Sequence, residues 1–324
     1  MIRFFTPFRT VRSTSAAAIV LAAIAFATLT TLTFTGCTAD EPIDMSQDTT
    51  AVGDTTNYTF AFEGDFAGPL GLQLYSIRQA LDDDVPGTLA WVRNAGFEEV
   101  ELAGTYGLTP EQFRRELDNA GLNATSMHTG YERFRDSLSA VLDEAEVLGV
   151  DYVGIAWIPH DGAFTVDQAR ETAANFNEWG AAAAERGLQF FYHNHGYEFQ
   201  PADDGTVPFD VLVEETDADD VKFEIDVFWT VHPGVDPAEL MRRYPDRWEL
   251  MHIKDMREGT PTGDFSGGAP PEAKVPVGGG MIDWTDVLAA AEEIGLDRYY
   301  IEDESTDPMG NIPLSTRYLE QVAY

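Results

Sequence analysis

Short apolar segments alternate with longer amphipathic segments from about residue 69 to the end of the chain. The apolar segments predict strands and the amphipathic segments predict helices. The expected strands are 71–77, 97–104, 122–128, 151–158, 188–195, 221–229, 248–256 and 297–305. The expected helices are 84–95, 109–121, 132–148, 165–187, 207–216, 236–244, 283–295 and 311–322. Because helical crossovers join parallel strands, this alternation predicts a parallel sheet.

The helix expected over residues 109–121 shows clear boundary signals. Thr109 suits the N-cap, Pro110 suits the first turn and Gly121 suits the stop position. Eight strand–helix units within residues 68–324 match the size of one closed barrel, so we expect an α/β protein with a single (β/α)8 TIM barrel. No G-x-G-x-x-G follows the first strand, which disfavours a dinucleotide-binding sheet.

The N-terminus has the features of an export signal. Arg3, Arg9 and Arg12 precede an apolar run over residues 16–33, and LTFTGC ends at Cys37, the only cysteine. This segment resembles a bacterial lipoprotein signal, which implies lipidation of Cys37 and export to the cell envelope, facing the periplasm or on the outer membrane. A short transmembrane anchor is the alternative. The expected parts are a signal peptide over 1–36, a flexible tether over 37–67 and the barrel over 68–324.

The charge balance is strongly acidic. The chain has 20 Lys and Arg residues against 56 Asp and Glu residues, and its net charge is -36. The acidic residues are spread along the chain, as in proteins that remain soluble in concentrated salt, where ions screen the self-repulsion. An acidic surface for a protein partner is the alternative reading. A nucleic-acid partner is excluded because no basic stripe faces a phosphate backbone.

Polar residues stand near the carboxyl ends of the expected strands, where barrel enzymes carry their active sites. They are Glu101, His128, His193, Asn194, His195, Asp226, His252, Lys254 and Glu302. Four of the chain's six histidines are in this set. Imidazole and carboxylate groups from neighbouring strands suit one divalent metal ion such as Mn, Co, Zn or Mg.

Several local motifs resemble those of the sugar phosphate isomerase/epimerase family, the xylose isomerase-like barrels. The motifs are VELAG at Glu101, YHNHGYEF, EIDVFW at Asp226, HPGVDP at His232, MHIKD at His252, VPVGGGMIDW and YYIED at Glu302. The resemblance implies a barrel that holds one divalent metal with Glu, Asp, His and Glu from strands 5 to 8. Three positions carry over to Asp226, His252 and Glu302.

The strand-5 position departs from the family pattern. Where the family has glutamate this chain has YHNH, so the fourth ligand carries over to His193, Asn194 or His195. We favour His195 because of its side-chain reach. The residues expected to contact substrate are Glu101, His128, Asn194, Trp229 and His232.

The resemblance also implies a mechanism. The metal chelates a carbonyl and an adjacent hydroxyl and stabilises the enediolate formed when a neighbouring C–H bond loses its proton. Glu302 accepts that proton in an isomerase or epimerase, His193 accepts it in a lyase, and Lys254 contacts a substrate oxygen. We expect a metal-dependent sugar isomerase or epimerase; the alternatives are a dehydratase-type lyase on a 3-keto sugar or inosose, and a non-catalytic sugar-binding lipoprotein.

The substrate is expected to be a small carbohydrate without phosphate. The glycines 278–280 could cradle a phosphate group, but Lys274 is the only cation nearby in the sequence. A neutral sugar, ketosugar or glycoside therefore fits better, and the membrane is expected to be contacted only through the N-terminal lipid.

Overall fold

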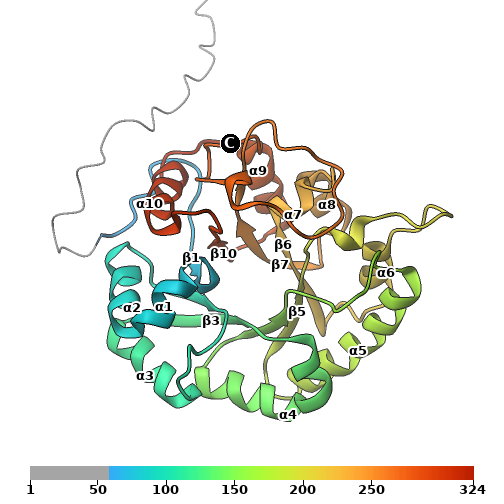
Figure 1. Cartoon of the computed structure of the whole chain (residues 1–324), viewed down its shortest axis with the longest axis horizontal. Helices are drawn as coiled ribbons and strands as arrows, with labels where there is room; N and C mark the ends of the chain where they lie inside the picture. Colours follow the sequence, from blue (N-terminus) through green and yellow to red (C-terminus); the bar gives the residue numbers. More distant parts are fainter. Residues whose placement is uncertain (1–57) are drawn as a thin grey trace, which may run out of the picture. The chain divides into compact units, whose positions relative to one another are not determined.

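The computed structural model describes residues 58–324, and in them parallel strands close into one barrel in the order β1-β10-β7-β6-β5-β4-β3-β2 (Figure 1). The barrel strands are β1 (Leu70–Gln73), β2 (Glu99–Leu102), β3 (Asn123–His128), β4 (Tyr152–Ile155), β5 (Gln189–His193), β6 (Val221–Asp226), β7 (Trp248–Ile253) and β10 (Tyr299–Ile301). The predicted single TIM barrel is confirmed.

Helices surround the barrel (Figure 1). They are α1 (Arg78–Asp83), α2 (Val85–Asn94), α3 (Pro110–Ala120), α4 (Tyr131–Leu148), α5 (Val166–Ala184), α6 (Pro208–Glu214), α7 (Val227–Val231), α8 (Pro237–Arg243), α9 (Trp284–Ile294) and α10 (Pro308–Leu319). The predicted boundaries of α3 are confirmed: Thr109 forms a capping box with Gln112, and Gly121 ends the helix with φ 70°. Within residues 58–324, no helix combines the length and apolarity needed to cross a bilayer.

Successive side chains of each strand point alternately into the barrel and out toward the helices. The inward-pointing apolar side chains form a layer that we call the floor. Phe191, Leu250 and Tyr300 form a buried cluster of their own. Each lies two residues before a polar residue of the same segment, so the two side chains share a face and the three apolar side chains lie beneath the polar layer. Gly154 makes room for this floor, because a Cβ there would stand 2.4 Å from the carbonyl oxygen of Phe191.

All eight barrel strands are shorter than the apolar runs that predicted them, and for two of them the structure shows the cause. The run 221–229 stops as a strand at Asp226, because the Asp226 carboxylate accepts a hydrogen bond from the backbone N–H of Trp229 at 2.8 Å and caps α7. The run 248–256 divides into β7 and β8 (Asp255–Met256). The second piece leaves the barrel and pairs antiparallel with β9 (Lys274–Val275).

The folded part begins earlier than the predicted boundary at residue 67. Phe66 is 1% exposed and its ring centroid lies 5.0 Å from that of Tyr299. Phe60 packs on Phe97 at 5.1 Å. Aromatic side chains in the expected tether thus cover the amino ends of β2 and β10, because burying them removes apolar area from water. The predicted signal peptide and Cys37 lie outside the described residues.

Candidate metal centre

Polar side chains from several strands meet inside the carboxyl end of the barrel. All are buried or nearly so. They are Glu101 of β2, His128 of β3, His193 of β5, Glu224 and Asp226 of β6, His252 of β7, and Glu302 directly after β10. The strand ends therefore bring together most of the predicted site residues.

Asp226, His252 and Glu302 form a compact group. Each offers one ligand atom, and these atoms lie within 4.8 Å of one another. Nδ1 of His252 lies 3.2 Å from Glu302 Oε2 and 3.7 Å from Asp226 Oδ2. Oδ2 of Asp226 is buried without a hydrogen-bond partner in the described residues. Since a buried unpaired carboxylate oxygen is costly and this donor set suits a divalent ion, the residues fit the predicted metal.

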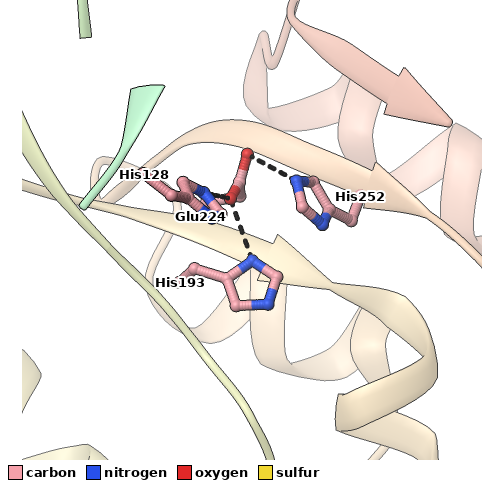
Figure 2. A group of neighbouring side chains, drawn as sticks. All are labelled: His128, His193, Glu224 and His252. Carbon is pink, nitrogen blue, oxygen red and sulfur yellow. Dashed lines mark hydrogen bonds and ion pairs between the residues drawn. The ribbon is translucent and has the colours of Figure 1, made fainter. Parts of the chain in front are cut away.

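Glu224 was missed by the sequence analysis and is central to the site. Its Oε2 lies 2.9 Å from His128 Nε2 and 2.9 Å from His193 Nδ1, and its Oε1 lies 3.2 Å from His252 Nε2 (Figure 2). Glu224 precedes Asp226 by two residues on the same strand, so alternation places both side chains inside the barrel. That spacing is the signal that would have identified it.

Glu101 contacts two of the same rings, at the same nitrogen atoms that Glu224 approaches. Its Oε1 lies 2.6 Å from His252 Nε2 and 3.2 Å from His128 Nε2, and it also accepts hydrogen bonds from Gln73 and Ser126. These four partners occupy both of its oxygens. Glu101 therefore positions the rings of His252 and His128, which differs from the predicted contact with substrate. His128, bonded to Glu224, is likewise part of the cluster.

The carboxylates control the charge of His252. Burial opposes its protonation, but Glu224 and Glu101 outweigh that cost and raise the pKa of His252 well above its usual value. Burial also favours the neutral form of Glu224, yet His252 and His128 hold the pKa of Glu224 well below its usual range. Glu224 is therefore ionised. To bind a metal through Nδ1, His252 would release a proton.

The two histidines of YHNH occupy different positions. His193 is 2% exposed, and its Nε2 lies 3.8 Å from Asp226 Oδ2. Burial and the neighbouring His252 cation hold the pKa of His193 well below its usual value, so its ring is neutral. An ionised carboxylate only accepts hydrogen bonds, so Nδ1 of His193 carries the proton and the Nε2 lone pair is free toward Asp226.

His195 lies farther from the compact group. Its ring stacks on Trp229 with centroids 4.7 Å apart, and its buried Nδ1 has no hydrogen-bond partner among the described residues. Burial lowers the pKa of His195 to about 4, so the ring is neutral. The geometry favours His193 over the predicted His195 as the fourth ligand.

Asn194 points away from the cluster, as alternation requires. Its Oδ1 accepts the backbone N–H of Asp226 at 2.9 Å, and its Nδ2 donates to Thr230 Oγ1 at 3.2 Å. Its amide holds the β6–α7 junction, which differs from the predicted substrate contact. His232 also lies outside the cluster, stacked on Phe228 at 5.6 Å.

Lys254 and Trp229 border the compact group. Nζ of Lys254 donates to Glu302 Oε2 at 3.0 Å and to Glu304, and it lies 3.9 Å from Asp226 Oδ2. Burial favours the neutral form of Glu302, but Lys254 outweighs it and holds the pKa of Glu302 well below its usual value. Nε1 of Trp229 is buried and unpartnered within residues 58–324.

Comparison with known proteins agrees with this architecture. The sequence profile of the xylose isomerase-like TIM barrel family matches residues 89–322. The inosose dehydratase of Lacticaseibacillus casei is 26% identical over 241 residues, which cover 66% of this chain and 80% of the relative. A sugar phosphate isomerase/epimerase from Parabacteroides distasonis superposes with a TM-score of 0.65 and 27% identity, covering 82% of this chain and 98% of the other.

A zinc-containing protein shares the fold. The structure of IolI with a bound zinc atom has a TM-score of 0.59 and 15% identity, covering 78% of this chain and 95% of the other. At that identity the likeness shows the fold alone.

Proposed function

Because the chain belongs to the xylose isomerase-like TIM barrel family, we propose that it is a metal-dependent lyase acting on a non-phosphorylated ketosugar or inosose-type ring. In this reaction the carbon beside the ketone loses a proton and a β-substituent is expelled. The observation that carries the proposal is the group Asp226, His252 and Glu302, with its unpartnered Asp226 oxygen. The relative named inosose dehydratase supports elimination.

The proposed ligands are Asp226, His252 and Glu302, with His193 as the fourth. Glu224 fixes the ring of His193 and Glu101 fixes the ring of His252, so that His193 Nε2 and His252 Nδ1 face Asp226. A divalent ion held there supplies Lewis acidity to the ketone oxygen.

His195 is the proposed proton acceptor. Its Nδ1 is unpartnered within the described chain, its ring stacks on Trp229, and the ring centroid of His193 lies 5.5 Å away. Glu302 and His193, the two acceptors expected from the sequence, are less suited to this role. Oε2 of Glu302 already accepts a hydrogen bond from Lys254, and Nδ1 of His193 is already bonded to Glu224, whereas Nδ1 of His195 has no partner among the described residues.

The triple glycine supports a substrate without phosphate. The backbone N–H groups of Gly278 and Gly280 both donate to Oδ2 of Asp255, at 2.9 Å and 3.1 Å. Since a carboxylate of the chain itself already accepts these amides, they do not receive a phosphate group.

Isomerisation or epimerisation is the second candidate, favoured by the Parabacteroides distasonis structure. Solvent exchange distinguishes the two. We would incubate the metal-loaded protein in D2O with inosose, ketosugars and 3-keto glycosides, and follow deuterium uptake by mass spectrometry together with enone absorbance. Elimination predicts an enone product, whereas isomerisation predicts a labelled sugar without loss of a substituent. If the protein binds metal but gives neither an enone nor a labelled sugar, both reactions are contradicted. Asp226→Asn is the matched inactive control.

A further inference from the structure

Two of the chain's three lysines lie buried together at the mouth of the barrel. Lys254 is 1% exposed and Lys274 is 6% exposed. Their Nζ atoms stand 5.2 Å and 5.5 Å from the ring centroid of Trp229. The remaining lysine, Lys222, lies near the amino end of β6 and donates to the backbone oxygen of Asp246 at 3.0 Å. In a chain with net charge -36, buried lysines beside a candidate active site need an explanation.

Lys254 and Lys274 differ in their partners. Lys254 is paired with Glu302 and Glu304. Lys274 donates one hydrogen bond, to the backbone oxygen of Ala269 at 2.7 Å, while Glu304 lies 4.0 Å away, beyond hydrogen-bond distance. An ammonium group has three N–H donors, so in the described residues Lys274 keeps two that no protein atom accepts. Buried donors at a site mouth are suited to a substrate oxygen.

Asp255 determines where Lys274 lies. Its carboxylate accepts hydrogen bonds from the backbone N–H groups of Met256, Gly278, Gly280 and Ile282 and from Nε1 of Trp284. These bonds tie the end of segment 257–283 to its beginning and support the pairing of Met256 with Lys274. Gly280 is required there, because a Cβ would lie 2.2 Å from Asp255 Oδ1.

The same segment crosses toward β4 and β5. A Cβ on Gly267 would lie 2.9 Å from the ring of Trp157 and 3.1 Å from that of Tyr197, so the segment rests on both rings. The backbone N–H of Gly263 also donates to the carbonyl oxygen of His232 at 2.9 Å. Segment 257–283 therefore forms a roof over the mouth, and Lys274 is its cation nearest to the candidate metal centre.

We propose that Lys274 is a further catalytic residue, whose ammonium group binds the substrate oxygen that gains negative charge as the C–H bond breaks. Asp255 is the positioning residue that holds Lys274 there. Interactions formed with developing charge stabilise the transition state more than the ground state. This inference rests on the proposed function.

The test uses paired ligands. A sugar-derived hydroxamic acid loses a proton when it chelates a metal, so the bound hydroxamate carries the negative charge of an enediolate, whereas the corresponding aldonamide binds as a neutral ligand. Binding of both to the metal-loaded protein would be measured by calorimetry for wild type, Lys274→Met, Lys274→Arg and Lys222→Met, with metal content determined for each. We expect Lys274→Met to weaken the hydroxamate about tenfold or more and the amide about twofold or less. Lys274→Arg should restore part of the loss, and Lys222→Met should match wild type.

Asp255→Asn gives an independent readout. It should raise hydrogen exchange across 257–283 and weaken the hydroxamate in the same direction, whereas Lys274→Met should leave the exchange unchanged. The proposal is overturned if Lys274→Met binds the hydroxamate like wild type, loses both ligands equally or loses its metal. If wild type turns over a substrate and Lys274→Met turns it over at the same rate, the role of Lys274 is contradicted and the proposed function stands. A metal-loaded wild type that binds neither ligand and turns over no ketone removes the proposed function as well.

Discussion

Nδ1 of His193 donates to Oε2 of Glu224 across 2.9 Å, and this bond turns the other ring nitrogen toward Asp226. A carboxylate that fixes the tautomer of a histidine is a common support for metal ligands. The bond joins neighbouring strands of the barrel, so the register of β5 on β6 positions the donor set.

The two histidines of YHNH should differ in their effect on metal content. His193→Gln should lose the bound ion, since it removes a donor beside Asp226, while His195→Gln should keep the ion and lose turnover. Elemental analysis of protein purified without chelators, combined with a deuterium-exchange assay, measures both. The opposite pattern, with metal lost only in His195→Gln, would restore the ligand expected from the sequence.

Glu224→Gln should weaken metal binding by roughly 10- to 100-fold without removing a ligand. Glutamine keeps the shape, but it removes the charge that holds His193 and His252. Competition with a chelator gives the affinity. Glu249→Gln is a suitable control because Glu249 lies on the barrel surface beside Lys222. An unchanged affinity in Glu224→Gln would mean that the rings need no such support.

Glu198 should make the protein less stable as the pH rises. It is buried, its Oε2 has no partner among residues 58–324, and burial raises its pKa to about 7. The folded state therefore binds a proton that the unfolded state has released. This stabilisation is complete below the unfolded pKa and is lost as the pH passes through about 7.

Glu198→Gln should remove that dependence. The unfolding free energy of Glu198→Gln minus that of wild type should rise by on the order of 3 kcal/mol as the pH goes from 4 to 8, because glutamine carries no proton to lose. Urea unfolding at several pH values, at constant high salt, measures the difference. Parallel curves for the two proteins would show that Glu198 titrates normally.

Phe66→Ala should destabilise the barrel by about 3–5 kcal/mol, as expected for truncating a buried aromatic ring. Phe66 is 1% exposed and packs on Tyr299. The comparison is Tyr75→Ala, since Tyr75 is 41% exposed. Thermal unfolding of both variants measures the loss of stability. Equally small losses of stability in the two variants would place the start of the folded part after residue 67.

The barrel was predictable because each strand–helix unit repeats the same pattern of apolar and amphipathic segments. Details at the strand ends were not. Asp226 ends one strand by capping the next helix, a contact that an apolar run such as VFW conceals. Glu224 was not predicted because the last polar residue of its strand is Asp226, and active-site residues were expected at the last positions of the strands. Phe66 lies in a segment rich in Thr, Asp and Ala, a composition that predicts a linker, and the surface that buries its ring exists only in the folded barrel.

The pair of Lys254 with Glu302 has a consequence for the effect of salt. The chain's net charge of -36 acts mainly through its surface, where dissolved ions screen repulsion. Lys254 and Glu302 are 1% and 8% exposed at a separation of 3.0 Å, so ions do not enter between them. Lowering the ionic strength should therefore reduce the fraction of folded molecules, while the rate constant of each folded molecule stays the same. Loss of activity in dilute salt would then report unfolding, and the active site itself would be unaffected.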